Sequence, residues 1–159
     1  MVCKNENSLI NSVKHIGLIM DGNRRWAKAN GLDLFRGHKK GADTAKLIIK
    51  TAIEEKIQNL TLFAFSSENW KRPANEVEDL IELLKFFLKS EINSLVKNGI
   101  KLKILGDISL FPKEIKDNLN LALTKTDKNN KLNLIIAINY GSRQEITNSI
   151  KNISKKIIN

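Results

Sequence analysis

Four short apolar runs punctuate the chain, and each predicts a β-strand. Every run is six or seven residues long, rich in isoleucine, leucine or phenylalanine, and followed by polar or turn-forming residues, which is typical of strands packed in a sheet. The runs are "HIGLIM" (His15–Met20), "LTLFAF" (Leu60–Phe65), "IKLKIL" (Ile100–Leu105) and "LNLIIAI" (Leu132–Ile138). The first is expected to be a short buried strand, and the fourth is the most strongly apolar.

Amphipathic segments between the first runs predict helices. A short helix is expected over about Arg24–Asn30, ended by Gly31, and a loop, "GLDLFRGHKKG", follows it. From Ala42 to Ile53 apolar residues recur at helical spacing with lysines and glutamates between them. This pattern predicts an amphipathic helix that begins after the loop.

Three further helices are indicated by their end signals. Asn75 is a suitable cap for a long helix that Gly99 ends, and Pro112 opens a helix that reaches about Thr126. Ser142 and Glu145 have the spacing of a capping box, which predicts a last helix that runs to the final residue.

Strands that alternate with helices predict an α/β fold with a mostly parallel sheet flanked by helices. Ligands of such folds bind beyond the carboxyl ends of the strands. The polar loops Asp21–Arg25 and Ser66–Arg72 are therefore expected to share one cleft. The sequence contains no repeat or linker, so we predict a polar leader over residues 1–14 and a single domain over residues 15–159.

Composition narrows the setting and the class of ligand. The sole cysteine, Cys3, excludes an intrachain disulfide, and no apolar run approaches the ~18 residues of a membrane span. We predict a cytoplasmic protein with at most peripheral membrane contact. The 27 lysines and arginines against 17 acids give a formal charge of +10, which attracts nucleic acids, acidic membrane surfaces or phosphorylated small molecules. Charge alone does not choose among them.

The stretch "MDGNRRWA" has the chemistry of a phosphate site. Gly22 and Asn23 tolerate a left-handed backbone that lets N–H groups face an anion, and Arg24 and Arg25 add charge-assisted hydrogen bonds. Asp21 makes sense there chiefly as a ligand of Mg²⁺ that bridges to phosphate oxygens. An ordinary Asp-Gly turn with solvated arginines is the alternative.

Two other polar stretches are open to two interpretations each. "LFRGHKKG" offers phosphate partners in Arg36, His38, Lys39 and Lys40, or it is a solvated basic loop. "FSSENWKRP" joins hydroxyls, an acid, an amide, an indole and Arg72 at a strand end, or it is a loop that Trp70 merely packs. Neither the Walker A spacing, nor a dinucleotide-fold glycine pattern, nor a zinc-ligand spacing occurs.

Taken together, five stretches resemble the cis-prenyltransferases, the family typified by bacterial undecaprenyl diphosphate synthase. In order, they are "HIGLIMDGNRRWA", "GHKKGA", "LTLFAFSSENWKRPANEV", "LKILGD" and "LNLIIAINYGSRQEI". The resemblance extends from about His15 to the C-terminus. It implies an enzyme that adds isopentenyl diphosphate with cis geometry to an allylic diphosphate, typically farnesyl diphosphate, to make a polyprenyl diphosphate lipid carrier of the cell wall. It also implies Mg²⁺, a homodimer and no nucleic-acid partner.

The resemblance further implies roles for individual residues. Asp21 corresponds to the catalytic carboxylate that binds the metal, and Asn69 to the family's assigned proton acceptor. Because a neutral amide is a poor base, we expect Asn69 to position isopentenyl diphosphate while a phosphate oxygen takes the proton. The residues implied to contact substrate are Gly22, Asn23, Arg24, Arg25, Trp26, His38, Ser66, Ser67, Glu68, Trp70 and Arg72. The apolar sheet face and the helix with Leu80–Leu95 are candidates for a tunnel around the hydrocarbon, although core packing alone explains the helix.

The chain departs from the family pattern in two places. Leu34 stands where the family carries an arginine, and Arg36 is the candidate replacement. The family also continues into another strand and an Arg-x-Ser/Gly-Gly-Glu-x-Arg motif, which supplies isopentenyl diphosphate ligands, a glutamate for Mg²⁺ and dimer surface. This sequence lacks that motif, so the resemblance implies a C-terminally truncated chain with an unpaired sheet edge beside Leu132–Ile138.

Several functions therefore stay open. The chain is part of an active synthase, as a fragment or as a subunit completed by a second polypeptide, or it is a non-catalytic subunit that binds an allylic diphosphate. A further alternative is a decayed and poorly folded remnant of such a protein. A nucleic-acid binder is disfavoured, because the arginines lie in diphosphate-type loops rather than along one exposed stripe.

Overall fold

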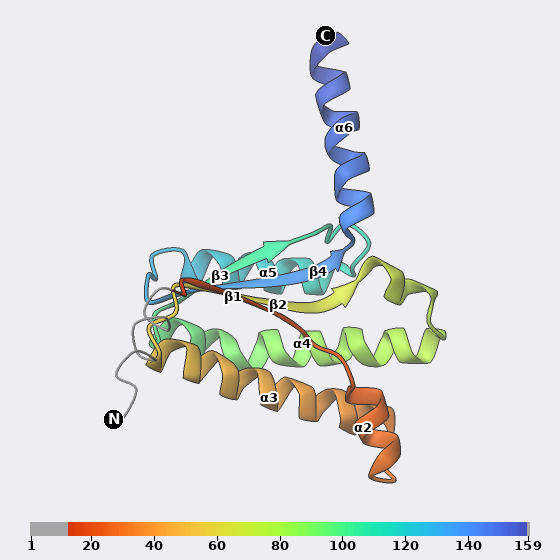
Figure 1. Ribbon diagram of the computed structural model, residues 1–159, viewed down its shortest axis with the longest axis vertical. Helices are drawn as coiled ribbons and strands as arrows, with labels where there is room; N and C mark the ends of the chain where they lie inside the picture. The colour runs from red at the N-terminus through yellow and green to blue at the C-terminus, as the bar shows by residue number, and fades with distance from the viewer. Residues whose placement is uncertain (1–12, 159) are drawn as a thin grey trace, which may run out of the picture.

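The computed structural model describes residues 13–158, in which strands and helices alternate as expected (Figure 1). Residues 1–12, which include Cys3 and most of the predicted leader, and Asn159 lie outside the described residues. The elements are β1 (His15–Ile19), α2 (Asn23–Ala29), α3 (Leu34–Glu54), β2 (Asn59–Ser66), the 3-10 helix η1 (Ser67–Lys71), α4 (Ala74–Lys97), β3 (Ile100–Leu105), α5 (Lys113–Thr126), β4 (Leu132–Tyr140) and α6 (Ser142–Ile158). No helix among these residues is long and apolar enough to cross a membrane.

All four strands pair in parallel, in the order β1-β2-β4-β3, which confirms the predicted α/β fold with a parallel sheet. β2 and β4 are the two inner strands, and in β4 Leu134 lies opposite Leu60 of β2 and Leu102 of β3. The expectation of an unpaired edge beside this strand is therefore wrong. β1 and β3 lie at the edges of the sheet. The inner position is favourable for β4, because it is the most apolar strand and has a strand on each side there.

The first strand is also less buried than expected. β1 lies at an edge, and only its Ile16 and Leu18 face the core, whereas Ile19 is 81% exposed. The prediction of a buried strand failed because an apolar run shows that a strand is favourable but does not show how many of its sides are covered.

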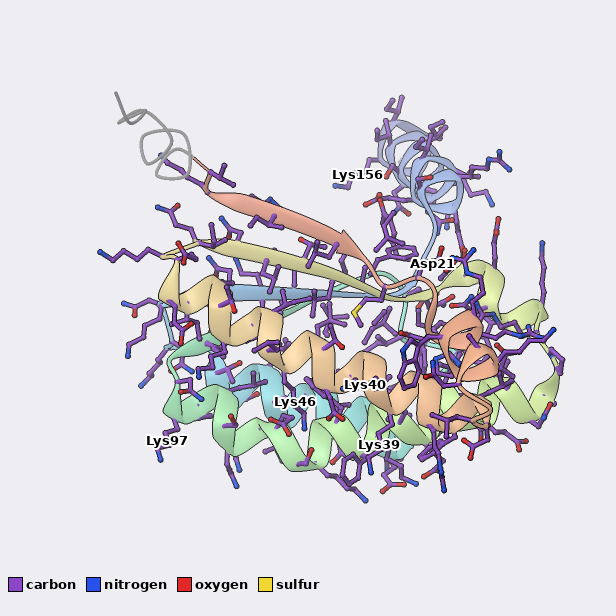
Figure 2. All side chains as sticks on the ribbon, turned by 60° about the horizontal axis from the view of Figure 1, so that its bottom comes forward. Asp21, Lys39, Lys40, Lys46, Lys97 and Lys156 are labelled. Atoms are coloured by element: carbon purple, nitrogen blue, oxygen red, sulfur yellow. The ribbon has the colours of Figure 1, made fainter. Side chains whose placement is uncertain are left out.

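Helices α3, α4 and α5 lie together on one face of the sheet (Figures 1 and 2). The core lies between this face and the helices, and its fully buried side chains include Leu60, Leu88, Leu119, Leu134 and Ile138. In contrast, α6 extends away from the sheet, and its apolar residues Ile146, Ile150, Ile153 and Ile157 are exposed (Figure 1).

Two helix starts differ from the predictions. α3 begins at Leu34 rather than after Gly41, with Asp33 as its N-cap accepting a hydrogen bond from the Arg36 N–H at 2.7 Å. α4 begins at Ala74 behind Pro73, so Asn75 is inside the helix and does not cap it.

The capping box predicted at the start of α6 does not form. Ser142 is already helical, and the carboxylate of Glu145 accepts a hydrogen bond from the hydroxyl of Tyr140 at 2.5 Å. Tyr140, the last residue of β4, thus takes the place of Ser142 as the partner of Glu145.

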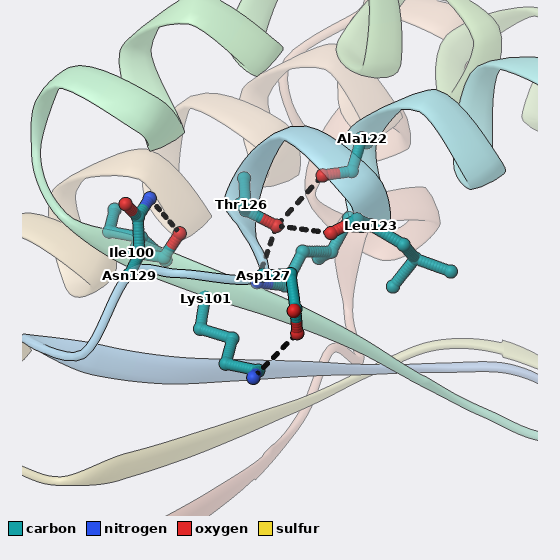
Figure 3. Close-up of polar contacts among 8 residues, drawn as sticks. Ile100, Lys101, Ala122, Leu123, Thr126, Asp127 and Asn129 are labelled. Atoms are coloured by element: carbon teal, nitrogen blue, oxygen red, sulfur yellow. Dashed lines mark hydrogen bonds and ion pairs between the residues drawn. The ribbon is translucent and has the colours of Figure 1, made fainter.

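A buried hydroxyl joins α5 to β3 at the amino end of the sheet (Figure 3). Thr126 is fully buried; its Oγ1 donates to the carbonyl of Ala122 at 2.8 Å and accepts from the N–H of Leu102 at 3.1 Å. Nearby, Asn129 donates to the carbonyl of Ile100 at 2.8 Å. Because a buried N–H without a partner costs free energy, this hydroxyl fixes the position of the helix on the strand.

Thr126→Val is expected to lower the free energy of unfolding by about 1–3 kcal/mol, because the N–H of Leu102 would stay buried without an acceptor. Denaturant titration measures the change. Thr124→Val is the matched control, since Thr124 makes the same kind of bond to the carbonyl of Asn120 on the exposed side of α5. Equal losses in the two variants would contradict the assigned role of Thr126.

Candidate active site

A cavity of about 440 Å³ opens where the chain leaves β1 and β2, and it brings the two predicted polar loops together. The charged side chains of the wall, such as Asp21 and Arg25, are exposed, whereas apolar ones such as Leu62, Phe65 and Ile138 are buried, so the wall is polar at the mouth and apolar inside. The polar part consists of Asp21, Gly22, Asn23, Arg24, Arg25, His38, Asn69 and Arg72. The apolar part consists of Met20, Ala42, Ala45, Leu62, Ala64, Phe65, Leu80, Leu83, Leu84, Phe87, Phe111, Ile136 and Ile138.

The first loop turns sharply from β1 into α2, with Asp21 at the turn (Figure 2). Gly22 has φ 93°, a left-handed conformation that favours glycine, and its N–H donates to the carboxylate of Asp21 at 2.6 Å. The second carboxylate oxygen accepts from Arg25 at 2.9 Å. Asn23 belongs to α2 and is not left-handed, so only the glycine half of that prediction is confirmed.

Two glycines of α3 allow α2 to lie close against this helix. A Cβ on Gly37 would lie 2.5 Å from the carbonyl oxygen of Asn23 and 2.8 Å from the Cβ of Ala27. A Cβ on Gly41 would overlap the side chain of Asn23. Gly37 and Gly41 were expected in a loop, but they lie within α3, where their lack of a side chain allows α2 to pack closely. For this reason α3 begins earlier than predicted.

The second loop is ordered by its own polar side chains. Ser66 caps η1 by accepting from the N–H of Glu68 at 3.1 Å, and the Oδ1 of Asn69 accepts from the N–H of Ser66 at 2.9 Å. Because its oxygen is engaged in this bond, the amide of Asn69 is fixed in orientation at the cavity wall.

Trp70 faces inward rather than onto the cavity wall. Its ring packs against Phe65 and Phe111 with centroid separations of 5.1 and 5.3 Å, and its Nε1 donates to Asn139 at 2.9 Å. Asn139 is buried, with φ 49°, and in turn donates to the carbonyl of Asp107 at 2.7 Å. The indole thereby links η1 to the carboxyl ends of β3 and β4.

Glu76 is a buried acid beside the cavity that the sequence analysis did not select. It is 2% exposed, and its two carboxylate oxygens face two arginines of the cavity wall, Arg72 at 2.8 Å and Arg24 at 3.6 Å. The spacing of four residues between Arg72 and Glu76 is the signal that could have indicated one of these contacts.

His38 lines the cavity from α3. Its Nε2 is buried and has no hydrogen-bond partner within the described chain. Burial lowers the pKa of the imidazole below its ordinary value; the nearby carboxylate of Glu76 opposes this effect and the guanidinium of Arg72 adds to it. The neutral ring presents one donor and one acceptor nitrogen.

Helix α4 divides into two parts along its length. Leu80, Leu83, Leu84 and Phe87 line the cavity, whereas Leu88, Ile92 and Leu95 are in the core. β2 contributes a register irregularity between Phe63 and Phe65, which places Ala64 and Phe65 on the same wall. Core packing is therefore confirmed for the second half of the helix, and the hydrocarbon tunnel stays a prediction for the first half.

The structure does not place every candidate residue on the cavity wall. Those outside the wall are Trp26, Arg36, Ser66, Ser67, Glu68 and Trp70. Arg36, the candidate replacement for the family arginine, pairs instead with Asp33 at 3.4 Å. Lysines are spread over α3, α4 and α6, as Lys46, Lys97 and Lys156 show in Figure 2, whereas the cavity gathers arginines.

A sequence profile of the family described as "Putative undecaprenyl diphosphate synthase" matches residues 19–159. The chain belongs to the cis-prenyltransferase family. A member of this family, the farnesyl-diphosphate-specific ditrans,polycis-undecaprenyl-diphosphate synthase of Wigglesworthia glossinidia brevipalpis, is 50% identical over 148 residues, which are 93% of this chain and 57% of that protein.

Solved structures of related proteins share the fold. Lavandulyl diphosphate synthase from Lavandula x intermedia, solved in complex with dimethylallyl diphosphate, matches with a TM-score of 0.86 at 32% identity over 91% of this chain and 62% of that one. A probable undecaprenyl diphosphate synthase from Campylobacter jejuni matches with a TM-score of 0.75 at 34% identity, over 92% and 63% of the two chains. The chain thus spans about 60% of the length of these cis-prenyltransferase relatives.

The donor set at the mouth fits Mg²⁺ only together with a ligand. Residues 13–158 contain no group of three or more potential metal-binding side chains, and Asp21 is the acid on the cavity wall. Mg²⁺ is commonly bound by one or two carboxylates and completes its shell with waters and substrate phosphates. The exposed carboxylate of Asp21 is sufficient for that mode of binding.

Gly37→Ala is expected to lower the free energy of unfolding by about 1–3 kcal/mol, because the added methyl group would collide with the backbone of α2. Denaturant titration tests this. Gly17→Ala is the control, since nothing lies within 4 Å of a Cβ at that position. An unchanged stability of the Gly37 variant would mean that α2 is not closely packed on α3.

The stability of the folded chain is expected to depend on the protonation of His38. Because burial lowers its folded-state pKa, the unfolded chain binds the proton first, so this contribution is present above about pH 6.5 and is lost as the pH falls through the lowered value. Between pH 7.5 and pH 5, the free energy of unfolding should fall less in His38→Gln than in the parent chain, as denaturant titration at the two pH values measures. An identical pH dependence would contradict the assignment.

Proposed function

We propose that this chain binds an allylic diphosphate in the cavity and serves as the allylic-substrate portion of a cis-prenyltransferase. The observation that carries the proposal is the division of one cavity into a cationic mouth and an apolar interior. Farnesyl diphosphate has the same division, with an anionic head and a hydrocarbon tail. A relative acts on farnesyl diphosphate by its name, and another was solved with dimethylallyl diphosphate.

The cationic mouth suits the departure of pyrophosphate. When the bond between the allylic carbon and the diphosphate oxygen breaks, negative charge grows on the leaving group, and cations placed there in advance lower the barrier. Arg24 and Arg25 come from α2 and Arg72 follows η1, and all three line this cavity. The unpartnered Nε2 of His38 supplies one further hydrogen-bonding atom.

The double bond of isopentenyl diphosphate would then attack the allylic carbon, and the new chain would lose a proton. Asn69 is suited to orientation rather than to proton abstraction, because its Oδ1 already accepts from Ser66 and its Nδ2 can only donate. A phosphate oxygen is the better acceptor for the proton.

Mg²⁺ bound by Asp21 and the diphosphate would neutralise charge on the leaving group. The carboxylate would have to be shared with Arg25, which it contacts at 2.9 Å. Both side chains are more than three-quarters exposed, so the pair is weak and its partners are free to rearrange.

A non-catalytic subunit that binds an allylic diphosphate is the second candidate. The arginines and the apolar interior of the cavity support binding of that ligand whether or not a reaction follows. Incorporation of labelled isopentenyl diphosphate onto farnesyl diphosphate with Mg²⁺ distinguishes the two. Product formed by this chain, alone or joined to the C-terminal part of a relative, supports the synthase; tight binding without product in either case supports the binding subunit.

The binding step is tested directly by calorimetry with farnesyl diphosphate. Arg72→Gln should weaken binding by roughly 10-fold or more, the loss expected for one charge-assisted hydrogen bond. The neighbouring exposed residue provides the control, and Lys71→Gln should change the affinity less than about 2-fold. If the parent chain binds farnesyl diphosphate no better than farnesol, the proposed function is wrong.

A further inference from the structure

We propose that Glu76 is a positioning residue that holds Arg72 and Arg24 in place for the diphosphate, an inference that rests on the proposed function. Glu76 is in the first turn of α4, Arg72 follows η1, and Arg24 is in α2. One carboxylate thus joins three segments that are separate in the sequence. Arg72 approaches Oε1 at 2.8 Å and Arg24 approaches Oε2 at 3.6 Å.

The burial of Glu76 is what makes this contact restrictive. An acid is common in the first turn of a helix, because its negative charge interacts favourably with the helix dipole. That interaction does not require burial, yet Glu76 is only 2% exposed. A buried carboxylate that loses its cation is strongly unfavourable, whereas an exposed ion pair contributes little. Arg72 therefore cannot swing into solvent without leaving the buried carboxylate to the more distant Arg24 alone, while Arg25 can leave the exposed Asp21 at small cost.

The charges in this cluster leave the arginines able to bind an anion. One carboxylate faces two guanidinium groups, so a net positive charge remains, and both arginines line the cavity. Each guanidinium carries five N–H donors, of which the ion pair occupies one end. A diphosphate would thus meet arginines whose side chains are already ordered, which lowers the entropic cost of binding.

The variant Glu76→Gln separates this role from a simple effect of charge. It removes a negative charge near an anionic ligand, so electrostatics alone predicts tighter binding of inorganic pyrophosphate. Positioning predicts the opposite, a loss of about 10-fold, because two long side chains must be ordered by the ligand. Glu78→Gln on the same helix is the matched control, since Glu78 is exposed, and its affinity should stay within about 2-fold of the parent.

The experiment is calorimetric titration of the 159-residue chain with pyrophosphate and with farnesyl diphosphate at one pH and salt concentration. A parallel loss for both ligands is expected in Glu76→Gln, since the change is at the head group. Equal or tighter binding of pyrophosphate overturns the inference and leaves the proposed function standing. A parent chain that binds neither ligand overturns both.

Two further measurements exclude a merely structural role. In an Arg72→Gln background the effect of Glu76→Gln should shrink to about 3-fold or less, because its main partner is gone; an undiminished 10-fold loss contradicts the inference. Glu76→Asp keeps the charge and withdraws the carboxylate by one methylene. It should bind several-fold more weakly than the parent, and parental affinity in this variant overturns the proposal even if the glutamine variant fails to fold.

Discussion

The burial of β4 between β2 and β3 is the constraint on which the rest of the molecule depends. Its apolar side chains Leu134, Ile136 and Ile138 need strands on both edges and helices on the face that they share with the core. Because all pairings are parallel, the carboxyl ends of the strands meet at one end of the sheet. The loops that follow β1 and β2 thereby border a single cavity, although about forty residues separate them in the chain.

Helix α4 borders the cavity with its first half and packs in the core with its second half. Near its start, leucines and Phe87 leave space against the sheet, and towards its end Leu88, Ile92 and Leu95 close the core. Packing in the second half anchors the helix on the core, while the first half borders the cavity. The result is an apolar chamber with its polar groups confined to the mouth, a shape suited to an amphiphilic ligand.

The polar mouth combines firm and loose ionic contacts. Asp21 and Arg25 are exposed and free to exchange partners, whereas Glu76 is buried and restrains two arginines. The proposed function, in which the site binds a metal and a diphosphate and then releases pyrophosphate, would use both kinds of contact. The contacts themselves show which arginine faces a buried acid and which one pairs with an exposed acid.

The sequence by itself determined the four strands, the segments that become helices, the two polar loops and the family. These features follow from local patterns: apolar runs, helical periodicity and motifs in which every residue is a neighbour of the next. The tertiary structure alone decided that β1 is an exposed edge, that Gly37 and Gly41 belong to a helix, that Trp70 faces Asn139 and that Glu76 is buried between two arginines. Each of these depends on contact between segments far apart in the chain, and no local pattern records how closely two such segments will pack.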